Sequence, residues 1–123
     1  MNVVCMHAVI GAYTSDGRQW VDELCQTLSD TIRYAYDYIQ THFSGIQTTM
    51  PEGTYMMLLD CEAWCTAHKK THQELLEAGW DAGVIWQDGS RFHMPYGVRM
   101  NFALPRSRVE EAMDRLNRLV FNA

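Results

Sequence analysis

The sequence predicts an α+β domain of two layers, in which helices pack on a small, mostly antiparallel sheet of three to four strands. Three kinds of segment lead to this prediction. An apolar stripe with helical spacing occupies residues 17–43, short apolar or alternating runs occupy 54–59, 84–86 and 96–103, and an amphipathic segment follows Pro105. Helices and short strands that follow one another in this order are typical of helices packed on an antiparallel sheet.

Two helices are predicted in the N-terminal part of the chain, and they differ in kind. Over residues 17–43 the apolar residues recur every three or four positions and so share one face; they are Trp20, Leu24, Leu28, Ile32, Ala35, Ile39 and Phe43. Gly45 then suits the left-handed backbone that ends many helices. Residues 1–13, in contrast, are apolar on nearly all sides. A helix of that kind has to be covered by another surface.

Shorter elements are expected in the middle of the chain. The apolar run 54–59 follows a turn signal and predicts a buried strand, with a further short strand near residues 46–48. Residues 66–78 predict a helix that ends before a glycine. Residues 84–86 predict a short strand, closed by a turn at 87–89.

The strand expected at residues 96–103 alternates in polarity. Val98 and Met100 should point to the core, and Arg99 and Asn101 to the opposite face. A guanidinium on a rigid strand offers a planar pair of donors that suits a carboxylate. The alternative is a surface arginine that forms an ion pair with one of the many acidic residues.

The last helix is expected after Pro105. Ser107 and Glu110 have the spacing of a capping box, in which each side chain accepts a hydrogen bond from a backbone N–H of the first turn. Its apolar face is formed by Val109, Ala112, Met113, Leu116, Leu119 and Val120.

Composition excludes several classes of protein. With 123 residues the chain has the length of one domain, and 10 basic against 15 acidic residues give a net charge of −5. The basic residues are scattered, so we expect no nucleic-acid partner. No apolar window is long enough to span a membrane, and no signal peptide is recognisable. Four cysteines are too few for a disulfide scaffold, which predicts reduced thiols and a cytoplasmic location.

A cluster of potential zinc ligands stands at Cys61, Cys65, His68 and His72. On one helix these residues would share a face but extend over roughly 16 Å, because each residue advances the helix by 1.5 Å. Four ligands spread over that length do not converge on one tetrahedral ion. We therefore expect no metal site, and a zinc-bound module remains a weaker alternative.

Four stretches resemble a known family when they are taken together. Residues 51–61 (PEGTYMMLLDC), 78–84 (AGWDAGV), 88–92 (DGSRF) and 98–105 (VRMNFALP) occur in this order. They resemble the C-terminal small domain of the class I/II aminotransferases, the fold-type I enzymes that use pyridoxal phosphate (PLP). The first stretch leans toward the cystathionine β-lyase-like, C–S lyase branch.

The resemblance implies roles for the parts of the chain. Arg99 would bind the carboxylate of an amino-acid substrate, and this domain would occupy residues 17–123. Residues 1–16 would pack on a large PLP-binding domain upstream of Met1, or on a partner. The parent enzyme would bind PLP, act as an aminotransferase or a C–S lyase, and form a homodimer. Whether it transaminates or eliminates is open.

Two departures from the family limit what this chain does alone. The family's P-G-x-x-F-G loop is replaced by residues 88–93 (DGSRFH), which leaves the shape of the loop and the substrate open. The only lysines are Lys69 and Lys70, expected on a solvated helix face, whereas a Schiff-base lysine should be desolvated. We therefore expect no catalytic or cofactor-binding residue in this chain, no activity, and no binding of PLP or substrate. The alternative function is a non-catalytic binding or oligomerisation module, with residues 1–13 as its dimer surface.

Overall fold

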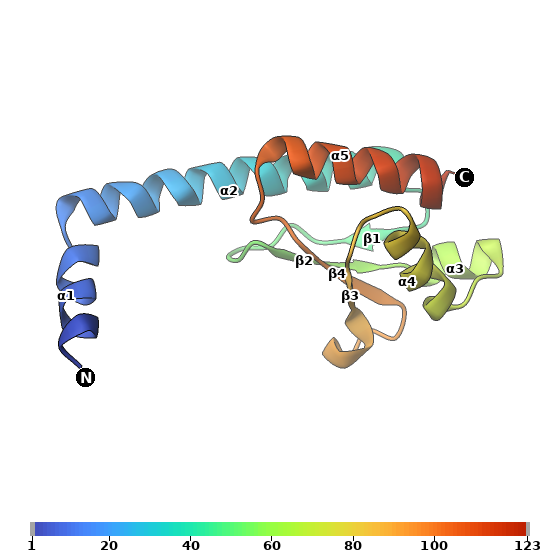
Figure 1. Ribbon diagram of the computed structural model, residues 1–123. Helices are drawn as coiled ribbons and strands as arrows, with labels where there is room; N and C mark the ends of the chain where they lie inside the picture. The colour runs from blue at the N-terminus through green and yellow to red at the C-terminus, as the bar shows by residue number, and fades with distance from the viewer. Residues whose placement is uncertain (1, 123) are drawn as a thin grey trace.

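The computed structural model describes residues 2–122 as helices on one sheet (Figure 1). In chain order the elements are α1 (Val3–Ala12), α2 (Ser15–His42), β1 (Gln47–Thr48), β2 (Met56–Asp60), α3 (Glu62–His68), α4 (His72–Asp81), β3 (Gln87–Asp88), a 3-10 turn (Gly89–Phe92), β4 (Gly97–Asn101), α5 (Arg106–Leu116) and a π-helical turn (Asn117–Phe121). The sheet has the order β1-β2-β4-β3, and all of its pairs are antiparallel. The predicted α+β fold class is confirmed.

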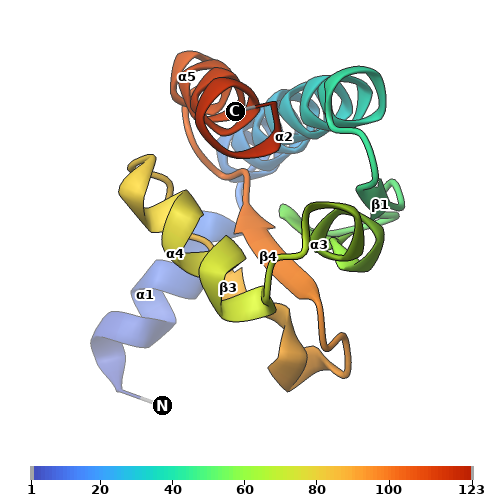
Figure 2. The same cartoon turned by 90° about the vertical axis from the view of Figure 1, so that its right-hand side faces the viewer.

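One face of the sheet carries the core. The C-terminal half of α2 and the whole of α5 lie side by side over this face, with α3 and α4 beneath them at its sides (Figure 2). Residues from both layers meet there with no exposed surface, among them Ile39 of α2, Leu59 of β2, Val98 of β4 and Met113 of α5. Burial of such side chains supplies about 1.5–3 kcal/mol each. The core therefore fixes β4 against the helices.

The register of β2 against β4 separates the two faces. Val98 lies opposite Leu59, and Arg99 lies opposite Leu58. Val98 and Leu59 are buried, whereas Arg99 and Leu58 are half-buried. Because successive side chains alternate across a sheet, Arg99 lies on the face opposite the core. The alternation predicted for this strand is confirmed.

The single helix predicted over residues 66–78 is wrong. The structure has two helices, because Lys69 adopts a left-handed backbone conformation (φ 54°) that ends α3. The side chain of Thr71 then accepts a hydrogen bond from the N–H of Glu74, and Glu74 accepts one from the N–H of Thr71. This capping box begins α4 and sets its first residue.

Two further details of the prediction are wrong. The strand expected at 84–86 is not paired in the described chain, and residues 87–88, predicted as part of a turn, form β3. The position of so short a strand depends on its neighbour: Gln87 lies opposite Arg99. The capping box predicted from Ser107 and Glu110 does not form either, because Pro105 occupies the N-cap and places Ser107 inside the helix. Glu110 pairs with Arg106 instead.

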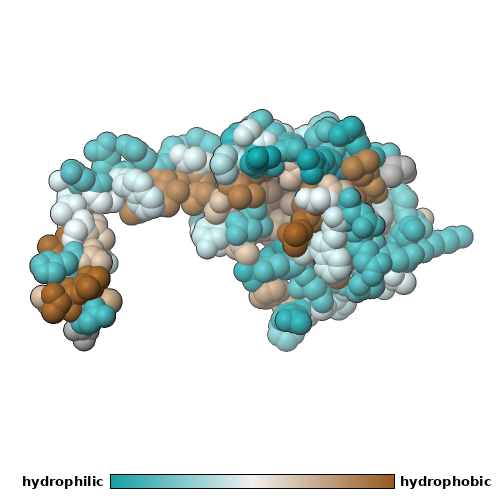
Figure 3. All heavy atoms as spheres, viewed as in Figure 1, coloured by the Kyte–Doolittle hydropathy of each residue, from teal (hydrophilic) through white to brown (hydrophobic). Residues whose placement is uncertain are grey.

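The N-terminal part of the chain extends away from this body. A helix is confirmed within residues 1–13, and the long predicted helix begins slightly earlier than expected, at Ser15. No residue of α1 is buried, and the first buried residue of α2 is Thr31. Apolar side chains cover α1 and the underside of the first half of α2 (Figure 3). None of the helices in residues 2–122 combines the length and apolarity needed to cross a membrane.

Candidate functional site

Arg99 lies at the centre of the uncovered face of the sheet. Its strand, β4, is an inner strand, and Leu58 of β2 and Gln87 of β3 lie directly opposite it on either side. Backbone pairing on both sides and the core beneath hold this position rigidly. The sheet therefore presents one half-buried guanidinium between two uncharged neighbours.

The guanidinium of Arg99 has no acidic partner among residues 2–122. Within residues 2–122 no carboxylate lies within ion-pair distance of it, and its Nε is buried without a hydrogen-bond partner. A buried N–H left without an acceptor costs about 1–3 kcal/mol. The ion pair required by the alternative reading of this residue is thus missing from the described chain.

The ring of Phe92 positions the guanidinium from one side. The Cζ of Arg99 lies 4.5 Å from the ring centroid of Phe92, which is within the range of cation–π attraction. Such contacts are worth roughly 0.5–1 kcal/mol at exposed sites. The contact restrains the side chain, whose buried Nε has no hydrogen-bond partner among residues 2–122.

The loop before Phe92 forms a tight turn although its sequence departs from the family pattern. The carboxylate of Asp88 accepts a hydrogen bond of 2.8 Å from the N–H of Ser90, and hydrogen bonds from Ser90 hold the pKa of Asp88 below its ordinary value. A side chain at Gly89 would come within 2.5 Å of the carbonyl of Gly97, so the two segments are in close contact. The 3-10 turn that follows carries Phe92 to Arg99.

The two lysines do not provide a site for PLP. Lys69 is exposed at the C-cap of α3, and the ammonium of Lys70 lies 3.7 Å from Glu74 with half of its side chain exposed. A lysine that forms a Schiff base needs a desolvated environment that lowers its pKa. Neither lysine therefore has the environment that a Schiff base with the cofactor requires.

The four potential zinc ligands are directed to different neighbours. Burial raises the pKa of Cys61 well above its usual range, and it also raises the pKa of Cys65. The Nδ1 of His68 lies 2.9 Å from the carbonyl of Trp64, and the Nε2 of His72 lies 2.9 Å from the carbonyl of Gly97. In the part of the chain that the structure describes, no three such ligands are grouped for a metal ion.

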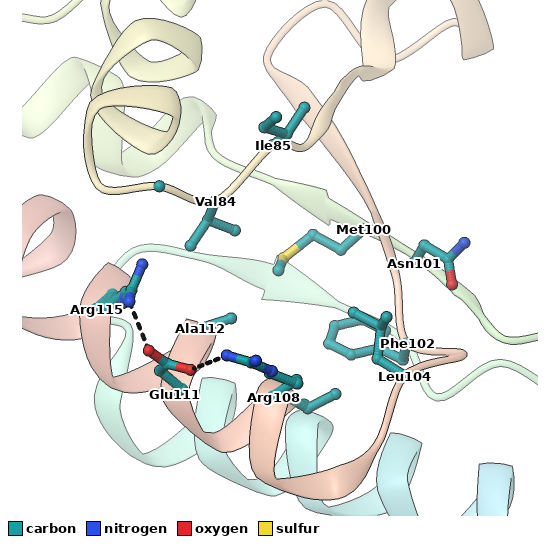
Figure 4. Close-up of a pocket in the computed structure, with 12 residues that line it drawn as sticks. Val84, Ile85, Met100, Asn101, Phe102, Leu104, Arg108, Glu111, Ala112 and Arg115 are labelled. Atoms are coloured by element: carbon teal, nitrogen blue, oxygen red, sulfur yellow. Dashed lines mark hydrogen bonds and ion pairs between the residues drawn. The ribbon is translucent and has the colours of Figure 1, made fainter.

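A hollow that the sequence analysis does not predict lies on the face of β4 opposite Arg99 (Figure 4). It has a volume of about 350 Å3. Its apolar walls come from residues 83–85, the end of β4 and α5, and include Val84, Ile85, Met100, Phe102, Leu104, Val109 and Ala112. The i, i+3 and i, i+4 spacing of Arg108, Glu111 and Arg115 is the only sequence signal for its charged rim.

The fold is shared with PLP enzymes of known structure. A PLP-bound C–S lyase from Staphylococcus hominis superposes with a TM-score of 0.76 at 22% identity, over 90% of this chain and 30% of that chain. Cystalysin from Treponema denticola, whose crystal structure contains pyridoxal 5'-phosphate, superposes with a TM-score of 0.75 at 25% identity, over 89% of this chain and 27% of that chain.

Sequence comparison gives the family. The model of aminotransferase class I and II matches residues 4–116, and the chain therefore belongs to this family. A curated relative, cystathionine beta-lyase PatB of Bacillus subtilis (strain 168), is 24% identical over 119 residues. That match covers 94% of this chain and 30% of the relative, so the chain spans about a third of the relative's length.

Proposed function

We propose that this chain is the small domain of a PLP-dependent aminotransferase or C–S lyase, and that Arg99 binds the α-carboxylate of its amino-acid substrate. The observation that carries the proposal is the state of Arg99: a rigidly placed guanidinium with a buried, unpartnered Nε and no carboxylate within reach in residues 2–122. A bidentate carboxylate would satisfy these donors. It would also align the substrate for reaction, because a fixed orientation lowers the barrier.

The cofactor enters this proposal from outside the chain. PLP acts as an electron sink for the reacting amino acid, and neither Lys69 nor Lys70 is placed to hold it. We infer that a larger domain, comparable to the part of the relatives that this chain does not match, holds the cofactor. Residues 1–16 would pack on that domain, since the apolar side chains of residues 3–13 are exposed here. Residues 17–123 would form the small domain. That the whole enzyme is a homodimer is a separate part of the proposal, which rests on the resemblance to the family.

A chimera tests the role of Arg99. This chain would replace the matched segment of the Bacillus subtilis relative, and the kcat/KM for cystathionine would be measured with PLP present. Arg99→Met should lower kcat/KM by about 10–100-fold, as expected when a charge-assisted hydrogen bond of roughly 1.5–3 kcal/mol is lost. Arg99→Lys should restore only part of this loss, because an ammonium does not bind a carboxylate bidentately.

The matched control is Arg33→Met. Arg33 is an exposed arginine of α2 with a long ion pair of 3.5 Å to Asp30, and its loss should leave kcat/KM unchanged. Equal effects of the two substitutions, or an unchanged kcat/KM in Arg99→Met, would contradict the proposed role of Arg99.

A further inference from the structure

The hollow between residues 83–85 and α5 has the shape and chemistry of a binding cleft. Met100 and Phe102 of the β4 segment and Ala112 of α5 line its inside (Figure 4). It lies on the face of the sheet opposite Arg99, since Met100 points to the core side and Arg99 does not. The cleft is therefore separate from the proposed carboxylate site.

The sheet stops early at this cleft. The ladder between β3 and β4 consists of the pairs Gln87–Arg99 and Asp88–Val98. Continued by two residues, the same register would place Ile85 opposite Asn101, but no hydrogen bond joins them. The backbone N–H and C=O of Ile85 have no protein partner anywhere in residues 2–122. Residues 84–86 thus have the composition of a strand without its ladder.

The side chain of Ile85 points away from the core beside this unpaired backbone (Figure 4) and is 88% exposed. An apolar residue on an open sheet edge is a liability in a free protein, because it invites pairing with another strand. Proteins that bind extended segments by adding a strand use the same features: free backbone groups for affinity and pockets for alternate side chains. The edge and the pocket lie together here.

The rim of the cleft has a charge preference. Glu111 lies between two arginines, 3.1 Å from Arg108 and 2.5 Å from Arg115. Two guanidinium groups against one carboxylate leave one positive charge in excess at the rim. This excess favours an occupant with an acidic side chain or a free carbonyl beside its apolar residues.

We propose that this cleft binds an extended segment of the cofactor-holding part of the enzyme, which pairs with the backbone at Ile85 and inserts apolar side chains against Met100, Phe102 and Ala112. The inference rests on the proposed function for the source of the segment. The relative's match covers 94% of this chain but 30% of the relative, so most of an enzyme of that length lies outside these residues. A segment with apolar side chains at alternate positions would fill the cleft and pair with the backbone at Ile85. An acidic residue in it would balance the excess positive charge of the rim.

Peptide binding to the chain itself tests the inference. The probes are short overlapping peptides that cover the part of the Bacillus subtilis relative outside the matched segment. Binding is followed by the backbone amide signals of the nitrogen-15-labelled chain. We expect peptides with alternating apolar residues to shift the signals of Ile85, Asn101 and Phe102.

Two variants and a control identify the site. Ile85→Asp places a charge on an exposed position and should weaken binding about tenfold or more, and Ala112→Leu should do the same by filling the cavity. Leu119→Asp is the control, since Leu119 is also apolar and exposed, at 55%, but lies outside the cleft. It should leave the affinity unchanged.

Several results would overturn the inference: no peptide that shifts these signals, shifts confined to α1, equal weakening by Leu119→Asp, or self-association of the chain through the cleft. The outcome is independent of the Arg99 test. If no peptide binds in the cleft but Arg99→Met lowers kcat/KM in the chimera as expected, the docking segment is rejected and the proposed function stands. If peptides bind in the cleft but Arg99→Met leaves kcat/KM unchanged, the cleft is supported as a binding site and the carboxylate-binding role of Arg99 is rejected.

Discussion

The two ends of the long helix α2 have opposite environments. From Thr31 onward α2 packs on α5 and the sheet, and Ala35 and Ile39 have no exposed surface. Before Thr31 the same helix has exposed apolar residues, among them Trp20 at 63%, and leads to α1, in which nothing is buried. One continuous helix thus joins a packed core to an exposed apolar surface. Arg99 lies in the packed region, so its position is fixed by residues of this chain.

The largest effect that separates the two regions is on stability. Leu59→Ala removes a side chain with no exposed surface from the centre of the core and should lower the free energy of unfolding by about 2–5 kcal/mol. Ile10→Ala in α1 should change it by less than about 0.5 kcal/mol. Denaturant unfolding followed by circular dichroism measures both. Similar effects of the two substitutions would mean that α1 is packed in the free chain.

Deletion of residues 1–13 tests whether α1 contributes to the stability of the domain. Because no side chain of α1 is buried, the shortened chain should keep its unfolding midpoint within a few degrees, which corresponds to about 1 kcal/mol for a domain of this size. It should also bind less of a dye specific for exposed apolar surface, because the exposed apolar residues of α1 are removed while those of α2 remain. Unfolding of the shortened chain at room temperature would contradict this division of the molecule.

A smaller effect is expected at the start of α4. Thr71→Ala removes the N-cap of that helix and should cost about 1 kcal/mol of stability. Ser107→Ala is the matched control, because Ser107 lies inside α5 and caps nothing. Chemical denaturation of the two variants provides the comparison. A larger loss of stability in Ser107→Ala than in Thr71→Ala would support the capping box that the sequence predicts at residue 107.

The same capping box predicts a pH dependence. Hydrogen bonds from Thr71 lower the pKa of Glu74 below its ordinary value of 4.5. A group whose pKa is lower in the folded state stabilises the fold above its unfolded pKa, and this contribution disappears as the pH falls through the folded pKa. The difference in stability between the wild type and Glu74→Gln should therefore shrink below pH 4.5. A difference that stays constant from neutral to acidic pH would contradict this role.

What the sequence predicts well depends on periodicity within one segment. The helix α2 and the alternation around Arg99 come from spacing alone, and both are confirmed, although the apolar stripe of α2 is buried only from Ile32 onward. The errors concern features that depend on contacts elsewhere. Lys69 adopts a conformation that is rare outside glycine, and β3 begins where β4 offers a partner rather than where its own residues are most apolar.

For the candidate site, too, only the features that depend on the local sequence were predictable. The face on which Arg99 lies follows from the strand pattern, and the resemblance to the family singles it out. The contact with Phe92 depends on a turn whose close packing against Gly97 no local pattern indicates. The cleft beside Ile85 comes from the way residues 83–85 diverge from β4, which is a property of the tertiary structure.

The most direct test of the central claim is the Nε–H signal of Arg99 in the chimera with nitrogen-15-labelled arginine. The group has no hydrogen-bond partner in residues 2–122, so a bound carboxylate should be its first acceptor. We predict that an amino-acid substrate analogue shifts the Arg99 signal and slows its exchange with water, while the signal of Arg33 stays unchanged. An analogue that binds with the Arg99 signal unmoved, or that moves both signals alike, would contradict the claim that this arginine receives the substrate's carboxylate.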